Sequence, residues 1–258
     1  MKKWKKLLVG LLAMALSLSC IPDCGFTVNA TGTAPGDPLS DFTWSIANDE
    51  ITIERYKGNE KKKVEFPAQE SSKIISIGDG AFQYFDKITE IKLPDAVKNI
   101  GKAAFSGCSS LTKINIPAGV TTIENETFSG CSSLTEIKIP NGVTTIGNEA
   151  FSGCSNLTKI NIPESVTSIG YGAFSDCSSL TEITIPARVT KIGSTAFSGC
   201  RGLTEITVAE GNTKYESKNC NAIIDRQNNT LIAGCQNTTI PDNITTIKGG
   251  AFSGCSGL

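Results

Sequence analysis

The chain has 258 residues, with 24 lysine and arginine side chains against 25 aspartate and glutamate side chains, so its formal net charge is −1. It contains no histidine, which removes the commonest general base and the commonest zinc ligand. Outside the first thirty residues, 20 basic and 24 acidic side chains remain, a net charge of −4 without a basic patch for nucleic acid. The composition therefore argues against nucleic-acid binding and against catalysis that depends on imidazole.

Residues 1–30 have the pattern of a secretory signal peptide. Four lysines precede an apolar run at residues 7–21, and a small-residue cleavage site ends at Ala30. The run is too short for a transmembrane helix, which needs about 20 apolar residues, and no other stretch comes close. We expect cleavage after Ala30 and a secreted or surface-attached product with no transmembrane segment. A lipoprotein modified at Cys20 is the less favoured alternative, because Ser17 stands where that motif has leucine.

A linker at residues 31–40 precedes a predicted β-hairpin at residues 41–73. Apolar residues alternate with polar ones in two runs, Phe42-Trp44-Ile46 and Ile51-Ile53. This period of two is typical of half-buried strands, and turn-forming Asn48-Asp49 separates the runs. Terminal caps shield the apolar end of a repeat array, so we expect this hairpin to cap the first repeat.

Residues 74–258 repeat with a period of 23 residues. Phenylalanine recurs at this step and cysteine follows three positions later, at Phe105, Phe128, Phe151, Phe174 and Phe197 and at Cys108, Cys131, Cys154, Cys177 and Cys200. Such a period predicts a solenoid, whose stacked coils bury the apolar side that no single coil can bury. We therefore expect columns of identical side chains, repeated at about 4.8 Å.

One unit, residues 100–122, indicates how each coil folds. Ile114 and Ile116 fit a short parallel strand with one buried face, so Lys113 and Asn115 must point outward. Proline follows the strand in six units and ends it, because proline has no amide hydrogen to donate. A second extended piece comes next, and the Ala-Phe segment is expected to form a short helical or 3₁₀ turn.

The unit resembles the signature of the BspA-type leucine-rich repeat family of cell-surface proteins, Ile-Gly-x-x-Ala-Phe-x-x-Cys-x-x-Leu-x-x-Ile-x-Ile-Pro-x-x-Val-x-x-Ile. The resemblance covers about residues 74–258. It departs at Glu124 and Lys248, which replace the glycine, at Thr127, which replaces the alanine, and at Phe85, which takes the first cysteine position. The resemblance implies a leucine-rich repeat solenoid of the α/β type, built mostly of short parallel strands and turns. It also implies an exported adhesion or host-interaction protein, since members are chiefly of that kind and some are reported to bind extracellular matrix.

The period breaks once, where one step is 55 residues long instead of 23. Two alternating runs at residues 222–225 and 230–233, with polar turn residues between them, predict an inserted hairpin at about residues 209–238. We expect this hairpin to project from one coil. The chain stops at Leu258 in mid-unit, so we also expect the protein to continue beyond that residue.

Eight cysteines lie outside the predicted signal peptide, six of them in the repeat column. Stacked coils bring neighbouring Cα atoms to about 5 Å, which is within reach of a disulfide. Free thiols that pack as small apolar residues are the favoured interpretation of the column. Cys220 and Cys235 flank the inserted hairpin and are the candidate disulfide. A linear column does not offer the tetrahedral convergence of a zinc site, so neither a metal nor a cofactor is predicted.

The candidate binding surface is the outward face of the predicted strands. Each strand supplies two outward side chains, and we call these twelve residues the ladder face: Glu90, Lys92, Lys113, Asn115, Glu136, Lys138, Lys159, Asn161, Glu182, Thr184, Glu205 and Thr207. The plain interpretation is structural, because glutamate and lysine alternate along most of the first column and can pair across strands. The functional interpretation is that an extracellular protein or glycan, such as host matrix or mucin, binds there through many weak polar contacts.

The sequence thus predicts a non-enzymatic binding or adhesion module. The acidic side chains sit on rungs of a regular ladder, without a pocket or a neighbour that would perturb their pKa, so no catalytic residue is predicted. The alternative function is a structural spacer or targeting array for an enzyme or anchor domain that lies beyond Leu258.

Overall fold

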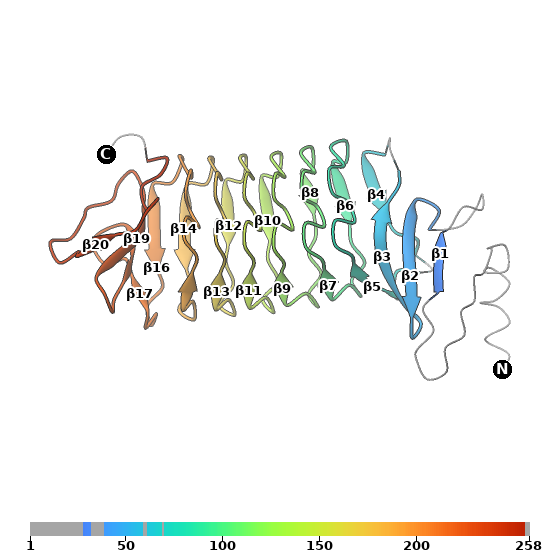
Figure 1. Ribbon diagram of the computed structural model, residues 1–258, viewed down its shortest axis with the longest axis horizontal. Helices are drawn as coiled ribbons and strands as arrows, with labels where there is room; N and C mark the ends of the chain where they lie inside the picture. The colour runs from blue at the N-terminus through green and yellow to red at the C-terminus, as the bar shows by residue number, and fades with distance from the viewer. Residues whose placement is uncertain (1–27, 32–38, 59–60, 69, 256–258) are drawn as a thin grey trace.

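The computed structural model describes residues 28–31, 39–58, 61–68 and 70–255, which form an elongated stack of coils (Figure 1). Most of the predicted signal peptide and linker lies outside these residues. The predicted cleavage point after Ala30 falls within strand β1 (Val28–Thr31), which pairs antiparallel with β2 (Phe42–Ala47).

The N-terminal hairpin cap is confirmed. Strands β2 and β3 (Glu50–Tyr56) pair antiparallel, with Ala47 opposite Glu50. The two turn residues between them, Asn48 and Asp49, have φ values of 51° and 65°, as the tight turns of hairpins require. Strand β3 then pairs parallel with β5 (Ile74–Ile77), and β5 pairs with β7 (Asn99–Ile100). The cap is therefore hydrogen-bonded directly onto the first coils.

Two rows of short parallel strands run along the stack. The strands that carry the ladder face, together with β4 of the cap, form three hydrogen-bonded groups, β4-β6-β8, β10-β12 and β14-β16. Their bounds are Lys63–Glu65 (β4), Glu90–Lys92 (β6), Lys113–Ile114 (β8), Glu136–Lys138 (β10), Lys159–Asn161 (β12), Glu182–Ile185 (β14) and Glu205–Val208 (β16). The second row contains β9 (Thr122–Ile123), β11 (Thr145–Ile146), β13 (Ser168–Ile169) and β15 (Lys191–Ile192).

The core is a set of columns, as the period predicts. Consecutive phenylalanine rings from Phe82 to Phe197 stack with centroids 5.3–5.5 Å apart and interplanar angles of 2–21°. The Tyr56 ring of the cap extends the column, 5.4 Å from the Phe82 ring. Each ring is buried, so the column removes a continuous apolar surface from water.

The predicted short helical segment is wrong in detail, because the described residues contain turns and strands but no helix. Alternate amides in the Ala-Phe segment donate to the next coil. Ala103 N donates to Asn125 O at 2.9 Å and Phe105 N donates to Thr127 O at 2.9 Å. An amide that bonds between coils is not available for a helical bond within its own coil. Stacking therefore replaces helix formation here.

The inserted segment joins the stack rather than projecting from it. Strands β17 (Tyr215–Glu216), β18 (Ala222–Asp225), β19 (Thr230–Gly234) and β20 (Thr246–Ile247) form one four-stranded sheet. The β18–β19 pair is antiparallel, and β19 pairs parallel with β20 of the last coil. All four side chains of β18 are buried. The expectation of a projecting hairpin is wrong because these strands are too apolar to stand in solvent.

Candidate binding face

The strands alternate buried and outward side chains, as the pattern predicts. The inward isoleucines at positions 91, 114, 137, 160, 183 and 206 are buried. Ten of the twelve ladder-face residues are exposed, and the other two, Glu90 and Asn115, are half-buried. The ladder face is therefore a real outward surface held by a buried row of isoleucines.

Part of this surface is an ion-pair network. Glu90 accepts from Lys63 Nζ at 2.8 Å and lies 3.5 Å from Lys113 Nζ, so three successive rungs are linked. The Lys63 hydrogen bond is the main reason that the pKa of Glu90 is lowered. Lys159 Nζ pairs with Glu182 at 2.9 Å, which raises the pKa of Lys159. These pairs fit the structural interpretation of the ladder.

Four other charges of the ladder face form no ion pair within the described residues: Lys92, Glu136, Lys138 and Glu205. Glu205 also lies directly opposite Glu182 in the β14–β16 register. Like charges opposite each other destabilise a sheet, so this rung is not explained by sheet stability. The structural interpretation accounts for the paired charges of the ladder face. It does not explain these four charged side chains.

The second outward column differs from rung to rung. Asn115 is held by the preceding coil, because its Oδ1 accepts from Leu93 N at 2.8 Å and its Nδ2 donates to Leu93 O at 3.1 Å. Thr184 and Thr207 bring their hydroxyl oxygens within 3.4 Å of each other. Asn115 thus serves the fold, whereas the other members of the column face solvent.

Comparison with known proteins agrees with this geometry. The chain matches the family described as "BspA type Leucine rich repeat region", with six copies over residues 49–179 and 228–258. The chain belongs to this family. No curated protein matches it.

Solved structures share the fold. The crystal structure of a T. pallidum leucine-rich repeat protein is 34% identical, with 68% of this chain and 81% of that chain covered and a TM-score of 0.61. A leucine-rich cell surface protein from Faecalibacterium prausnitzii is 26% identical, with 94% and 70% covered and a TM-score of 0.67. The pneumococcal vaccine antigen PcpA is 24% identical, with 84% and 62% covered and a TM-score of 0.69. These similarities indicate a repeat-based protein-interaction module.

The cysteine column of this BspA-type repeat consists of free thiols, which are buried from Cys108 to Cys200 and half-buried at Cys255. Each Sγ contacts a carbonyl oxygen of the preceding coil at 3.0–3.2 Å, from Cys108 with Phe82 to Cys200 with Phe174. Burial raises the pKa of Cys108 and of Cys200 to about 12. A thiol with so high a pKa is protonated at neutral pH and is a poor nucleophile, so the column is structural.

Cys220 and Cys235, the candidate disulfide, are both free cysteines in the structure. They pack in different places. Cys220 belongs to the small core of the insertion with Ala222 and Ile224, whereas Cys235 belongs to the main core. The Cys235 thiol contacts Asn221 O at 3.4 Å instead of a second sulfur.

The described residues contain no cluster of three or more potential metal ligands. These residues also contain no helix with the length and hydrophobicity of a membrane span.

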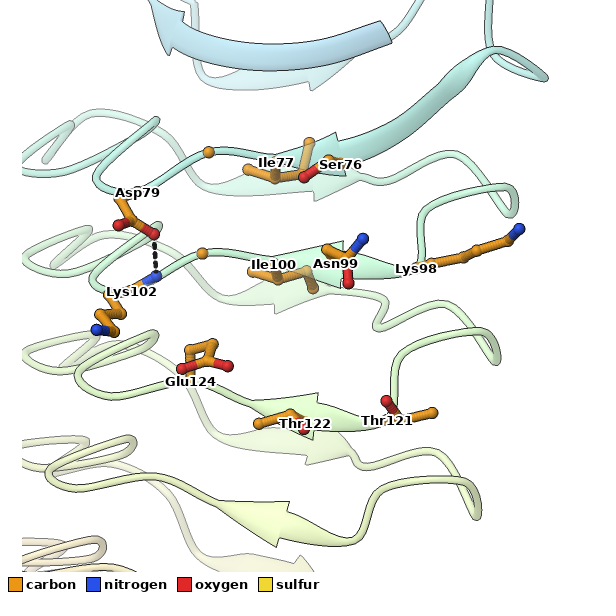
Figure 2. Close-up of a pocket in the computed structure, with 12 residues that line it drawn as sticks. Ser76, Ile77, Asp79, Lys98, Asn99, Ile100, Lys102, Thr121, Thr122 and Glu124 are labelled. Atoms are coloured by element: carbon orange, nitrogen blue, oxygen red, sulfur yellow. Dashed lines mark hydrogen bonds between the residues drawn. The ribbon is translucent and has the colours of Figure 1, made fainter. Parts of the chain in front are cut away.

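A hollow of about 380 Å³ lies beside β5, β7 and β9, and Figure 2 shows its lining from three successive coils. The carboxylate of Asp79 at its edge already has a hydrogen-bond partner, because its Oδ1 accepts from Lys102 N at 2.7 Å. The hollow shares no residue with the ladder face.

A second groove, of about 500 Å³, does reach the ladder face, at Glu205 and Thr207. Its other side comes from the inserted segment, including Asn219 and Asn221, and from Asn237 and Thr239 of the last coil. The sequence analysis missed these residues. A signal was available, since Asn237 and Thr239 stand four and two positions before a proline, as Lys113 and Asn115 do.

Proposed function

We propose that the chain is a secreted or surface-attached, non-enzymatic binding module whose ladder face recognises an extracellular protein or glycan. Host matrix proteins and mucins are the partners to test first. Export would follow from the predicted signal peptide, with cleavage after Ala30. The F. prausnitzii relative is described as a cell surface protein, which supports the same location here.

The observation that carries this proposal is the set of ladder-face charges without a partner. Lys92, Glu136, Lys138 and Glu205 lie on outward positions of three ladder strands, and they are exposed to solvent. Extended sheet surfaces of this kind are what repeat proteins use for binding. Exposed charges give orientation and specificity more than affinity, so each contact is expected to be weak and the whole face to act together.

The test is a binding assay of the 258-residue chain on immobilised matrix proteins, mucins and glycans. The ladder variant changes Lys92, Glu136, Lys138 and Glu205 to serine. The matched control changes Asp95, Lys98, Glu164 and Lys191 to serine, which removes the same charges from exposed positions off the ladder face. The proposal expects the ladder variant to lose binding and the control to keep it.

Equal binding by both variants would place recognition elsewhere on the molecule. If the folded protein binds none of the probes, the spacer function becomes the better account. Mass spectrometry of the exported protein tests the cleavage separately, since a mature chain that does not begin at Thr31 would contradict the predicted site.

A further inference from the structure

The groove at the C-terminal end of the ladder face is a gap between two rungs. One wall is β16, with Glu205 and Thr207, and the other carries Asn237 and Thr239, which occupy the corresponding outward positions of the last coil. The inserted segment, including Asn219, lies between these walls. The gap exists because the insertion interrupts the regular step of the ladder.

Side chains of the insertion hold this gap open. Asn221 Oδ1 accepts from Ile206 N at 2.6 Å, and Ser217 Oγ accepts from Val208 N at 2.8 Å. Asn221 Nδ2 also donates to Thr204 O at 2.7 Å. These bonds occupy the edge of β16, so the next coil does not pair with it. The groove is a built feature of the fold and its shape is set before any ligand arrives.

The lining is polar and almost uncharged. It contains three asparagines, three threonines, one serine and a single carboxylate, that of Glu205. Side-chain polar groups of Glu205, Asn219 and Thr239 have no hydrogen-bond partner within the described residues. Pockets for small ligands span about 300–1,000 Å³ and are usually apolar, so this one has a suitable size but an unusual lining.

That lining matches a polyhydroxylated ligand. Sugar hydroxyls donate and accept at once, and amide and hydroxyl side chains do the same. A carboxylate accepts strong hydrogen bonds from hydroxyls and repels anions. An apolar ligand would cover the free polar groups of Glu205, Asn219 and Thr239 without pairing them, which is costly.

We propose that this groove is a binding subsite for a neutral oligosaccharide. The inference rests on the proposed function and deepens it, because it names the ligand class for one end of the ladder face. Glu205, Asn219 and Thr239 supply the free hydrogen-bonding groups, while Ser217 and Asn221 shape the site.

The test is isothermal titration calorimetry of the 258-residue chain with neutral tetrasaccharides, namely cellotetraose, xylotetraose, maltotetraose, mannotetraose and chitotetraose. Glu205→Gln removes the charge and keeps the shape, and Thr239→Val removes a hydroxyl that bonds to nothing in the described residues. The matched control is Glu164→Gln, the same change at an exposed position off the ladder face and outside the groove. We expect at least one sugar to bind with a Kd below about 1 mM, weakened about tenfold by each groove variant and unchanged by the control.

Three outcomes overturn the proposal. In the first, none of the five sugars binds the folded protein. In the second, the control weakens binding as much as Glu205→Gln does, which shows that the loss does not come from the groove and leaves the proposed function intact. In the third, a Gly-Lys-Gly peptide competes for the groove better than any sugar, which makes the site a peptide site. Failure of the proposed function is seen separately, as equal binding of the ladder variant and its control to matrix proteins.

Discussion

The regular stack and the inserted segment satisfy the backbone hydrogen bonds of neighbouring coils by different means. In the stack, each coil satisfies its backbone through the coil 23 residues away, so Phe128 N donates to Ala150 O at 2.8 Å and the pattern recurs along the column. In the insertion, single side chains accept hydrogen bonds from the backbone amides of neighbouring strands. Tyr215 Oη accepts from Ile192 N at 3.1 Å at the edge of β15, and Asn221 and Ser217 cover the edge of β16.

This difference predicts two kinds of sensitivity. A column repeats the same contact many times, so damage to one coil separates the stack into parts that still resemble the whole. The insertion depends on residues that occur once. We expect mutations in the stack to cost more free energy of unfolding, and mutations in the insertion to act locally.

The largest effect is expected for Phe151→Ala, in the middle of the ring column. The Phe151 ring is buried between Phe128 and Phe174 at 5.4 Å from each, so its loss leaves a cavity between two coils. Phenylalanine-to-alanine changes in cores cost about 3–5 kcal/mol. Urea unfolding should show this loss, together with a broadened transition as the two parts of the stack separate.

The control is Tyr171→Ala, because Tyr171 is an aromatic residue of the neighbouring turn with a side chain exposed by 51%. This variant should lie within about 0.5 kcal/mol of the wild type. A comparable loss in both variants would contradict the assignment of stability to the ring column.

The period made the stack predictable from the sequence, and particular residues show why. Phe151 and Cys154 each have identical neighbours 23 residues away, so geometry at one coil constrains all coils. The same reasoning placed Glu136 and Lys138 outward. It did not foresee that Ala103 and Phe105 bond to the next coil, because hydrogen bonds between coils depend on the stacking and not on local propensity.

The second prediction concerns Asn212→Ala, in the inserted segment. Asn212 is 3% exposed, and its Nδ2 donates to Pro186 O at 2.9 Å and to Val189 O at 3.1 Å. Its Oδ1 accepts from Lys214 N at 2.9 Å and from Tyr215 N at 2.7 Å. Leaving a buried polar group without a partner costs about 1–3 kcal/mol.

Hydrogen exchange should show where this loss occurs. Amides of β17, β18 and β19 are expected to lose protection from exchange in Asn212→Ala, while the Phe128 amide should remain protected. The matched control is Asn161→Ala, an exposed asparagine of the ladder face. Uniform loss of protection along the chain would show that the insertion and the stack unfold as one unit.

The insertion could not be read in the same way because nothing repeats in it. Asn212 follows Gly211 and looks like an ordinary turn residue in the sequence, yet it anchors four backbone groups of two segments. The groove depends on Asn219 and Asn221, which have φ values of 58° and 52° and occur at no period. Only the alignment of Asn237 and Thr239 with the outward positions gave a signal.

The smallest effect is expected at alkaline pH and tests the free-thiol column. Burial raises the pKa of the Cys154 thiol well above its ordinary value of 9.0. The folded protein therefore keeps a proton that the unfolded chain releases above pH 9, so the contribution to stability is full below pH 9 and is lost as the pH rises further. At pH 10 the loss is about 1 kcal/mol for one buried thiol.

Cys154→Ala should lose about that much less stability than the wild type between pH 7 and pH 10 in urea unfolding. Ser152→Ala, on the same coil, has no group that titrates and should follow the wild type. If Cys154→Ala does so too, the thiol is not protected by the stack, and the packing of the column must be looser than its contacts with the Phe128 carbonyl indicate.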